Sequence, residues 1–595
     1  MSEHVIISLG FIVLLGFAAQ WISWAIKLPS ILFLLLFGIL AGPVLGFINP
    51  DKLLGEVLIP FVSISVAVIL FEGGLTLKIK EFKEIGKVVL LLITVGVLIT
   101  WIATTAAAYL IFHINIEISV LLGAVLTVTG PTVIIPLLRN IRPTQTIGNI
   151  LKWEGILIDP IGALLAILVF EAILIGEVQS AMTAIILSLL KTIIFGAAIG
   201  GAFAMLLTLI IKKYWVPDYL QEAAALTFVV SVFLVSNYIQ EESGLLAATI
   251  MGIVFTNQKH VPIKKIKDFK ENLTILMIPI LFILLSARLS LSDIELISYS
   301  GILFLVVLLF LIRPLSVFIS TINSKLKIKE KLFIGWMAPR GIVAAAVSSV
   351  FALKLMEINL PQIEYLVPVT FLVIIGTVII YSLTSPQFAK LLDLSQSNPQ
   401  GIVIAGAQDW ALQLALVLQE RDFKVVMLDT DRYNINKAKM MGLTALNESI
   451  ISDKVIDKIN LEGVGKLFAM TSNDEANSLG VLHFSEIFDQ ENLFQLHPDT
   501  HKDEQDFSPL YLRGRYLFDK GINYTMLTQR FYKGATIKST NLTEKFGYDD
   551  FKQKYGESVI PLLLIDEDEN IIPVVDEENS VKQGNTLIAL VDDND

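Results

Sequence analysis

The chain has 595 residues, of which 54% are hydrophobic and 17% are charged, and it carries a formal net charge of −11. It contains no cysteine, which excludes disulfides, thiolate metal sites and a cysteine nucleophile. Stretches of about twenty apolar residues recur as far as residue 390, a pattern typical of a polytopic helical membrane protein. The acidic excess lies after residue 396, where 33 acidic residues stand against 19 basic ones. We therefore predict a membrane domain over residues 1–392 and an acidic soluble part over residues 396–595.

Thirteen apolar segments are predicted to cross the membrane as helices. They span approximately residues 4–26, 29–47, 56–76, 86–112, 117–138, 146–176, 178–211, 217–239, 243–257, 269–289, 296–320, 331–354 and 364–390. The loops on one side of this arrangement hold nearly all of the lysines and arginines, whereas the alternate loops hold only Lys52 and Lys354 beside several acids. This positive-inside pattern predicts an integral protein of the plasma or inner membrane, with its N-terminus outside and its C-terminal part in the cytoplasm.

Helix-breaking residues occur at matching places in the two halves of this arrangement. Thirteen helices divide into six, a linking helix and six, and a repeat displaced by seven helices enters the membrane in the opposite orientation. The fifth helix of the first half contains Gly130 and Pro131, and the fifth helix of the second half contains Pro339 and Gly341. Single Pro and Gly kinks are common in membrane helices, but equivalent positions favour a transporter with inverted repeats. We expect two discontinuous helices that cross near the bilayer midplane and face an ion site.

Asp159 is a lone carboxylate within an apolar run over residues 156–170. An ionisable group at membrane depth costs roughly 2.5 kcal/mol or more, so such residues usually mark an ion or proton pathway. A carboxylate can bind either a proton or a metal cation, and partial desolvation brings the two affinities into balance. We predict that Asp159 binds the exchanged ion, with the hydroxyls of Thr127 and Thr129 beside it. The alternative is a buried aspartate in a packing role.

Glu154 lies five residues before Asp159, about 140° around the same expected helix, so the two carboxylates need not share a face. Three arginines also lie in or near apolar segments, namely Arg288, Arg313 and Arg340. Because an unpaired charge in the membrane is costly, we expect Glu154 to form a structural salt bridge with Arg340 or Arg288. A role for Glu154 as a ligand of the transported ion is the alternative.

These motifs resemble the monovalent cation:proton antiporter superfamily, and most closely its sodium/proton exchangers with thirteen helices. The resemblance covers residues 1–390 and rests on residues 71–75, 129–131, 154–160 and 338–342. It implies alternating access and a homodimer. It also implies that Asp159 carries the exchanged ion, that Thr129 lines the site, and that Glu154 stabilises the core through an arginine.

The chain departs from this family at two positions near the predicted ion site. The family usually has Asp where this chain has Gly130, and Asn or Asp where it has Ile158. The site is therefore poorer in oxygen ligands than usual, and Asp159 is the only exchangeable carboxylate that we expect there. One such carboxylate predicts one cation, Na⁺ or K⁺, per proton and electroneutral exchange.

Residues 396–525 are predicted to form a Rossmann-like unit that binds a nucleotide. The order is strand 402–405, a turn at Gly406, helix 412–421 and strand 424–429. Only Gly406 remains of the usual glycine fingerprint, and Asp409 would repel a pyrophosphate, which disfavours a dinucleotide. An adenine nucleotide with Asp429 on its ribose is one interpretation. The other is a Rossmann-like fold that has lost its ligand and serves for dimerisation.

This unit resembles the regulator-of-potassium-conductance domains of channels and transporters, and the resemblance extends through residues 471–477. Residues 526–595 are similar to the small α+β subdomain that often follows such units and binds a cyclic dinucleotide in some relatives. We therefore expect a regulatory domain in which an adenine nucleotide or a cyclic dinucleotide acts as the signal. No cofactor is required for transport in this interpretation.

The predicted function is a secondary active antiporter that exchanges Na⁺ or K⁺ for H⁺, and the protein is not expected to be an enzyme. The main alternative is a ligand-gated potassium efflux channel or transporter with the same regulatory domain. A channel would need a filter such as Thr-Val-Gly-Tyr-Gly, which the sequence lacks. A membrane oxidoreductase would need an intact dinucleotide fingerprint and a redox centre. The six histidines show no metal-ligand spacing, and neither a metal site nor a nucleic-acid partner is expected.

Overall fold

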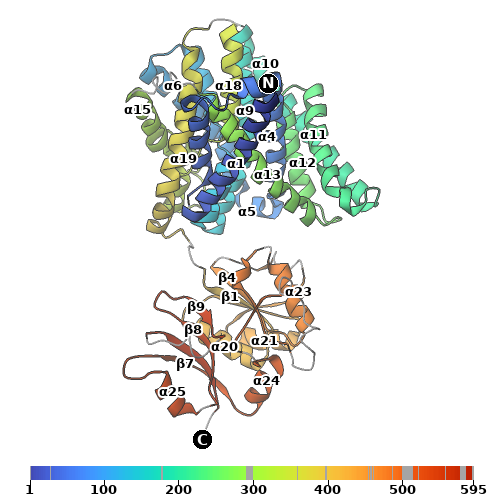
Figure 1. The fold of residues 1–595 in the computed structure, drawn as a ribbon, viewed down its shortest axis with the longest axis vertical. Helices are drawn as coiled ribbons and strands as arrows, with labels where there is room; N and C mark the ends of the chain where they lie inside the picture. The colour runs from blue at the N-terminus through green and yellow to red at the C-terminus, as the bar shows by residue number, and fades with distance from the viewer. Residues whose placement is uncertain are drawn as a thin grey trace. The chain divides into compact units, whose positions relative to one another are not determined.

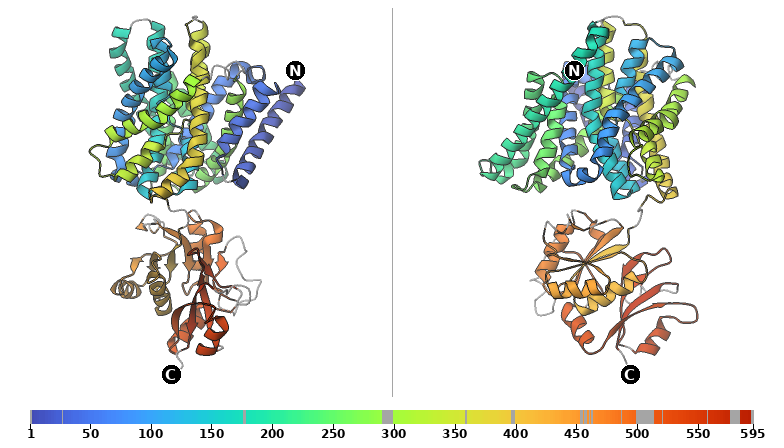
Figure 2. Two further views of the ribbon diagram at one scale, coloured as in Figure 1. Left: turned by 90° about the vertical axis from the view of Figure 1, so that its left-hand side faces the viewer. Right: turned by 180° about the vertical axis from the view of Figure 1, so that it is seen from behind.

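The computed structural model describes residues 2–592, apart from residues 27, 176–177, 290–298, 358–359, 396–398, 453–454, 456–457, 460, 462, 486, 499–512, 520, 557 and 576–583. The chain divides into two compact units, Met1–Ser395 and Gln396–Asp595. We call them the helical unit and the C-terminal unit. The first consists of helices, and the second contains two β-sheets flanked by helices (Figures 1 and 2).

The helical unit contains helices throughout its described length. They are α1 (Ser2–Ile26), α2 (Ser30–Ile39), α3 (Pro50–Leu54), α4 (Leu58–Leu75), α5 (Ile79–Leu91), α6 (Val97–Phe112), α7 (Ile116–Val125), α8 (Pro131–Ile141), α9 (Gln145–Ile175), α10 (Val178–Lys212), α11 (Gln221–Ile239), α12 (Gly244–Asn257), α13 (Lys264–Ala287), α15 (Tyr299–Val307), α16 (Arg313–Ser320), α17 (Ile328–Trp336), α18 (Ile342–Glu357) and α19 (Leu366–Leu391). Among the described residues, nine helical stretches are long and apolar enough to cross a membrane, and four shorter apolar helices accompany them. Each of the thirteen predicted segments overlaps one of these stretches.

The two predicted breaks are present in the fold. The fifth segment is divided into α7 and α8, and the twelfth into α17 and α18. Pro131 occupies the first turn of α8, where its missing N–H would have had no partner in the helix. The sequence prediction of two discontinuous helices is therefore confirmed.

The two halves also share an irregularity that the sequence did not reveal. A π-helical turn at Leu92–Gly96 separates α5 from α6 in the fourth segment, and a second one at Leu308–Ile312 separates α15 from α16 in the eleventh. These segments occupy equivalent places in the predicted repeats. Each π turn inserts one residue and rotates the rest of the helix, and such turns are frequent at functional sites. The repeats therefore match in the fourth and in the fifth helix of each half.

Buried apolar side chains of the helical unit form two large clusters. One contains residues from α1, α2, α5 to α9 and α15 to α19, and the other contains residues from α10, α11 and α12. Only α4, α12 and α13 contribute buried residues to both clusters within the described part of the chain. The helical unit thus consists of two packed bodies that share a few helices.

The C-terminal unit begins with a parallel sheet of Rossmann type. Its strands are β1 (Gly401–Ala405), β2 (Val425–Asp429), β3 (Thr444–Asn447), β4 (Val464–Ala469), β5 (Leu493–Gln495) and β6 (Arg515–Tyr516), in the spatial order β3-β2-β1-β4-β5-β6. The helices of this part include α20 (Asp409–Gln419), α21 (Arg432–Met440) and α23 (Asp474–Phe484). The strand order reverses between β1 and β4, which is where ligands bind in sheets of this class. The predicted Rossmann-like fold is confirmed.

A small antiparallel sheet completes the unit. It consists of β7 (Thr536–Asn541), β8 (Ile560–Ile565), β9 (Ile571–Pro573) and β10 (Thr586–Val591) in the order β7-β10-β8-β9, with α24 (Tyr524–Tyr532) before it and α25 (Tyr548–Tyr555) after β7. Its apolar side chains join those of α20 in one cluster, so the two sheets share a core. The predicted α+β subdomain is therefore present.

A buried lysine joins the two sheets. Lys466 of β4 is 7% exposed, and its Nζ donates to the side-chain oxygen of Gln400 and to the carbonyl of Ile571 in β9. The same Gln400 oxygen accepts the Ile571 N–H at 2.9 Å. Burial lowers the pKa of Lys466 to about 8, although the nearby Asp566 opposes this shift.

This lysine predicts an alkaline dependence of stability. The folded unit loses the Lys466 proton near pH 8, whereas the unfolded chain keeps it up to about pH 10.5. Because the unfolded state binds more protons in that interval, the free energy of unfolding rises with pH, by an amount on the order of 1–3 kcal/mol. Thermal unfolding of the full-length protein at pH 7.5 and pH 9.5 measures this rise. A Lys466→Met variant with the same pH dependence would contradict the assignment.

Candidate functional site

The two broken helices meet at Gly130 and Gly341. A Cβ atom placed on Gly130 would lie 2.4 Å from the Cα atom of Gly341, and the converse distance is also 2.4 Å. The Gly130 N–H donates to the carbonyl of Pro339 at 3.3 Å. Only glycine leaves room for two backbones this close. The structure therefore brings the predicted break residues Gly130, Pro131, Pro339 and Gly341 together at one crossing.

Asp159 lies beside this crossing on α9. The two glycines one turn to either side of it show the contact, because a Cβ on Gly155 would lie 3.4 Å from Ile134 of α8 and a Cβ on Gly162 would lie 2.9 Å from the Thr127 hydroxyl. The stretch of α9 that holds Asp159 therefore packs along the break between α7 and α8. The Asp159 side chain is 2% exposed, and its Oδ1 accepts no hydrogen bond from the described residues.

Two threonine hydroxyls at the break also have no partner among the described residues. They belong to Thr129, which the sequence predicted, and to Thr132 in the first turn of α8, which it did not. A third hydroxyl, that of Thr127, donates to the Ala124 carbonyl at 2.7 Å and can offer only its lone pairs. Buried polar atoms almost always have a partner. Asp159 Oδ1 and the two hydroxyls are thus oxygens near the crossing that, among the described residues, remain available to a bound ion.

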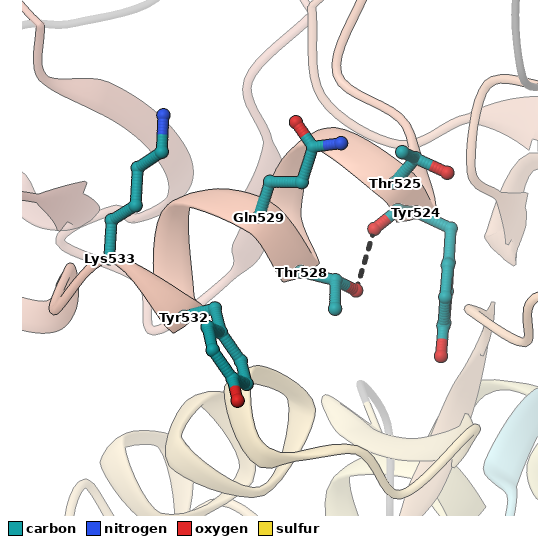
Figure 3. A pocket seen from close by; sticks show the side chains of 6 residues that line it. All are labelled: Tyr524, Thr525, Thr528, Gln529, Tyr532 and Lys533. Atoms are coloured by element: carbon teal, nitrogen blue, oxygen red, sulfur yellow. Dashed lines mark hydrogen bonds between the residues drawn. The ribbon is translucent and has the colours of Figure 1, made fainter.

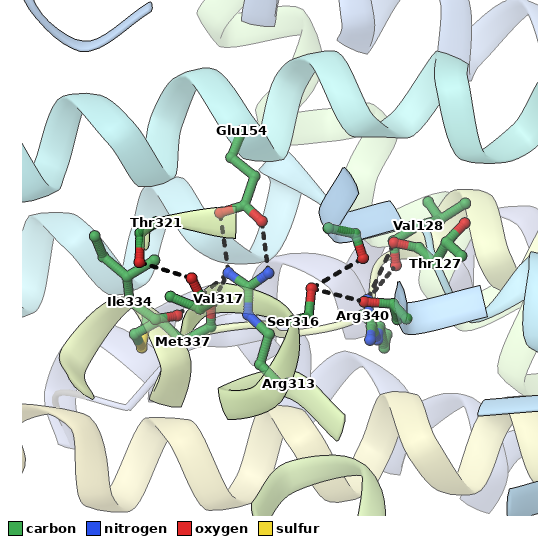
Figure 4. A network of polar contacts seen from close by, with 12 residues as sticks. Thr127, Val128, Glu154, Arg313, Ser316, Val317, Thr321, Ile334, Met337 and Arg340 are labelled. Atoms are coloured by element: carbon green, nitrogen blue, oxygen red, sulfur yellow. Dashed lines mark hydrogen bonds and ion pairs between the residues drawn. The ribbon is translucent and has the colours of Figure 1, made fainter. Parts of the chain in front are cut away.

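Arg340 binds the backbone that the first break exposes. Its side chain is 1% exposed, and its Nη1 donates to the carbonyls of Thr127 and Val128 at 3.2 and 3.3 Å (Figure 4). These carbonyls follow the C-terminal end of α7, where unpaired carbonyl groups concentrate negative partial charge. Arg340 therefore neutralises a helix end rather than a carboxylate.

Glu154 pairs with Arg313 in a buried bidentate salt bridge. The two guanidinium nitrogens lie 2.6 and 2.9 Å from the two carboxylate oxygens, and Nη2 also donates to the carbonyls of Ile334 and Met337 (Figure 4). The side chains are 1% and 6% exposed. This network joins α9 to the start of α16 and to the end of α17, next to the second break.

The predicted partners of Glu154 were therefore wrong. Arg340 binds the carbonyls described above, and Arg288 pairs with Asp51 at 3.1 Å in a partly exposed contact. The physical reason is that the tertiary fold brings Glu154 together with Arg313, 159 positions along the chain, directly after the π-helical turn at Leu308–Ile312. Helical periodicity along the sequence does not reveal such a turn.

These two arginines provide a matched test of stability. Breaking a buried ion pair from one side costs about 3–5 kcal/mol, whereas an exposed pair is worth about 0–1 kcal/mol. We expect Arg313→Met to lower the thermal unfolding temperature of the purified protein strongly and Arg288→Met to lower it little. Equal losses in the two variants would contradict the assignment of Arg313 as the partner of Glu154.

An acidic cavity lies farther along α9. It has a volume of about 410 Å³ and is lined by Glu171 of α9 and by Glu241 and Glu242 of the turn between α11 and α12. Burial raises the pKa of Glu242, and Lys354 of α18 opposes that shift. Glu171 lies twelve residues after Asp159 on one helix, so the cavity lies at the end of α9 away from the loop that joins α8 to α9.

In the C-terminal unit, the predicted nucleotide residues Gly406 and Asp429 lie together at the switch point. Gly406 has φ of +107°, and a Cβ there would lie 2.5 Å from the Met470 carbonyl, so this position requires glycine. The Asp429 carboxylate accepts the Ala407 N–H at 2.8 Å and the Asp431 N–H at 2.9 Å. A loop amide that could bind a phosphate thus already has a partner within the chain.

Two further side chains occupy this loop. Gln408 donates to the Met470 carbonyl at 2.7 Å and so bridges β1 to the end of β4, and Asp409 pairs with Lys437. A separate hollow of about 370 Å³ lies on α24 and includes neither Gly406 nor Asp429 (Figure 3). It is lined by Tyr524, Thr525, Thr528, Gln529, Tyr532 and Lys533.

Comparison with known proteins places these features in context. Residues 10–391 match the family described as sodium/hydrogen exchanger, transmembrane, and residues 402–501 match the TrkA-N domain. The chain is 28% identical over 418 residues to Na(+)/H(+) antiporter 1 of Methanocaldococcus jannaschii, covering 67% of this chain and 95% of that protein. It is 26% identical over 402 residues to the K(+)/H(+) antiporter NhaP of Alkalimonas amylolytica, covering 67% of this chain and 68% of that protein.

The fold also resembles a solved antiporter. The structure of the sodium proton antiporter MjNhaP1 from Methanocaldococcus jannaschii at pH 8 matches with a TM-score of 0.59 and 24% identity. The match covers 65% of this chain and 99% of that one.

Proposed function

Because the chain belongs to the transmembrane sodium/hydrogen exchanger family, we propose that it exchanges one monovalent cation, Na⁺ or K⁺, for one proton by alternating access. The observation that carries this proposal is the buried Asp159 beside the crossing of two discontinuous helices. A lone desolvated carboxylate gains more from a proton or a cation than from remaining charged and unpaired, and it can hold only one of them at a time. The unpartnered threonine hydroxyls at the break supply neutral oxygens of the kind that a cation requires.

The charges near the crossing support electroneutral exchange. Asp159 and Glu154 carry negative charges, and Arg313 and Arg340 carry positive ones, so the four groups balance when Asp159 is ionised. Binding a proton or a monovalent cation raises the total to +1 in either case. The two loaded states therefore have the same charge, and exchanging one for the other moves no net charge across the membrane.

The packing of the helical unit supports alternating access. The helices of the crossing and α9, which carries Asp159, contribute to the first cluster together with α1, α2, α5, α6 and α15 to α19, whereas α10 and α11 contribute to the second. A movement of the first body against the second would expose Asp159 to either side in turn. In this proposal the basic loops face the cytoplasm, as does the C-terminal unit, and the acidic cavity at Glu171 opens to the outside. The proposal includes a homodimer in the plasma or inner membrane.

Regulation by the C-terminal unit is part of the same proposal. Gly406 and Asp429 lie at the position where a nucleotide ribose and phosphate bind in Rossmann-like folds. An adenine nucleotide would have to replace the Ala407 amide on Asp429, so we propose a signal that rearranges this loop. A cyclic dinucleotide at the small antiparallel sheet is the second candidate signal.

The central prediction concerns Asp159. In proteoliposomes with an imposed pH gradient, we expect wild-type protein to exchange protons for Na⁺ or K⁺ and Asp159→Asn to lose at least about 100-fold in rate, because the amide cannot bind a proton or balance a cation. Asp51→Asn serves as the control, since that carboxylate is exposed and lies far along the chain from the crossing.

Retained exchange in Asp159→Asn would contradict the proposed site. Absence of coupling to every monovalent cation in wild-type protein would contradict the proposed function. Turnover that follows an imposed membrane potential at equal pH would contradict electroneutrality.

The regulatory prediction is a ligand-dependent change of stability. A ligand that binds the folded state at 100 times its Kd stabilises the protein by about 2.7 kcal/mol. We expect an adenine nucleotide or a cyclic dinucleotide to raise the unfolding temperature of the full-length protein. Asp429→Ala should remove the effect of the adenine nucleotide and leave that of the cyclic dinucleotide. If none of these nucleotides stabilises the protein, the dimerisation interpretation of the C-terminal unit is favoured instead.

A further inference from the structure

Residues 392–395 lie between the end of α19 at Leu391 and the start of the C-terminal unit at Gln396. We call Asp393, Leu394 and Ser395 the strap. The chain leaves α19 in a tight turn, because Asp393 has φ of +58° and the Leu394 N–H donates to the Ala389 carbonyl at 2.9 Å. The Leu394 side chain is 7% exposed and belongs to the apolar cluster of the helical unit. The strap is therefore packed against the helical unit.

The strap is bonded to the C-terminal end of α8. The Thr144 N–H donates to the Leu394 carbonyl at 3.0 Å, and the Ser395 hydroxyl donates to the Ile141 carbonyl at 2.8 Å. Pro143 and Ser395 also form an isolated antiparallel bridge. Ile141 is the last residue of α8, and the final carbonyls of a helix lack partners within it. The strap thus provides a cap for this half-helix.

The strap also contacts the beginning of α17. Asp393 pairs at 2.6 Å with Lys329, the second residue of that half-helix. The two side chains are 81% and 51% exposed, so the pair contributes little stability. The pair does show, however, that the strap contacts α17 as well as α8, so one short segment contacts both discontinuous helices.

The far ends of both half-helices lie at the ion site. α8 begins at Pro131, directly after Gly130, and α17 ends at Trp336, directly before the second break. The half-helices have 11 and 9 residues, so each spans only about 14–16 Å. Each half-helix therefore has the strap at one end and the crossing at the other.

We propose that the strap is a positioning element of the ion site, through which the C-terminal unit sets the affinity of that site for its cation. This inference rests on the proposed antiport. The unit is joined to the helical unit by the chain that follows Ser395, so a movement of the unit pulls first on the strap. The strap transmits the movement to α8 and α17 together, and the oxygens beside Asp159 change their spacing. Displacements on the order of 1 Å at a binding site are enough to alter its function.

The alternative is that the strap only caps α8, and matched variants separate the two interpretations. Ser395→Ala removes the hydroxyl that binds Ile141, and Ser395→Thr retains a hydroxyl. Ser324→Ala is the control, because the Ser324 hydroxyl donates to the Thr321 carbonyl at 2.7 Å beyond the end of α16 and has no contact with the strap. Lys466→Met perturbs the C-terminal unit at the junction of its two sheets.

The measurement is cation/proton exchange by the full chain in proteoliposomes, recorded against cation concentration and pH. We expect Ser395→Ala to change the KM for the cation by about threefold or more with a smaller change in the maximal rate, and Ser395→Thr to restore it. Ser324→Ala should leave KM unchanged. Lys466→Met should shift KM or the pH profile when Ser395 is present and lose this effect in the double variant Lys466→Met, Ser395→Ala.

Two results would overturn the inference. One is an unchanged KM in Ser395→Ala, and the other is a Lys466→Met effect that simply adds to that of Ser395→Ala. Hydrogen exchange at residues 126–130 and 337–341 provides a second readout, because a local cap would change exchange at Ile141 without changing it at the breaks. If wild-type protein shows no exchange of any cation, the proposed antiport function is wrong. That result differs from exchange that is present but insensitive to Ser395→Ala, which contradicts only the role of the strap.

Discussion

The contact between the backbones at Gly130 and Gly341 is the constraint on which the helical unit depends. Two membrane helices can be interrupted only where their freed backbone groups find partners. Here Arg340 donates hydrogen bonds to the carbonyls after α7, and the Gly130 N–H donates to the Pro339 carbonyl. Groups at one break thus serve as hydrogen-bond partners for backbone groups at the other. A side chain at either glycine would collide with the opposite backbone. Asp159 lies beside this arrangement, since α9 packs along the break.

The same contact explains why the site is poor in charged ligands. The exchangers that the chain resembles usually have Asp at the position of Gly130, but in this structure any Cβ there would strike Gly341. The negative charge near the crossing is supplied by Asp159 and Glu154, and Glu154 is fully engaged by Arg313. A single carboxylate therefore remains for the exchanged ion, and proton and cation must compete for it. Our proposal of electroneutral exchange rests on this competition and on the fixed charges around it.

The sequence predicted the features that local chemistry determines. Pro and Gly reveal helix breaks, a lone carboxylate in an apolar run reveals Asp159, and strand periodicity reveals the Rossmann-like sheet. It did not predict Arg313 as the partner of Glu154, because only the tertiary fold brings these two residues together. Thr132 was missed because one hydroxyl near a helix start carries no distinctive signal. The strap was missed because its contacts join residues about 250 positions apart and only the tertiary fold brings them together.

The chain that follows Ser395 links the C-terminal unit to the strap. The strap caps α8 and contacts α17, and these half-helices end at the crossing. The central claim, however, concerns Asp159. The most direct measurement is the number of protons released when a cation binds to the purified protein in weakly buffered detergent solution. The account predicts about one proton released per Na⁺ or K⁺ bound by wild-type protein and none by Asp159→Asn. Cation binding without proton release, or equal release by the variant, would contradict it.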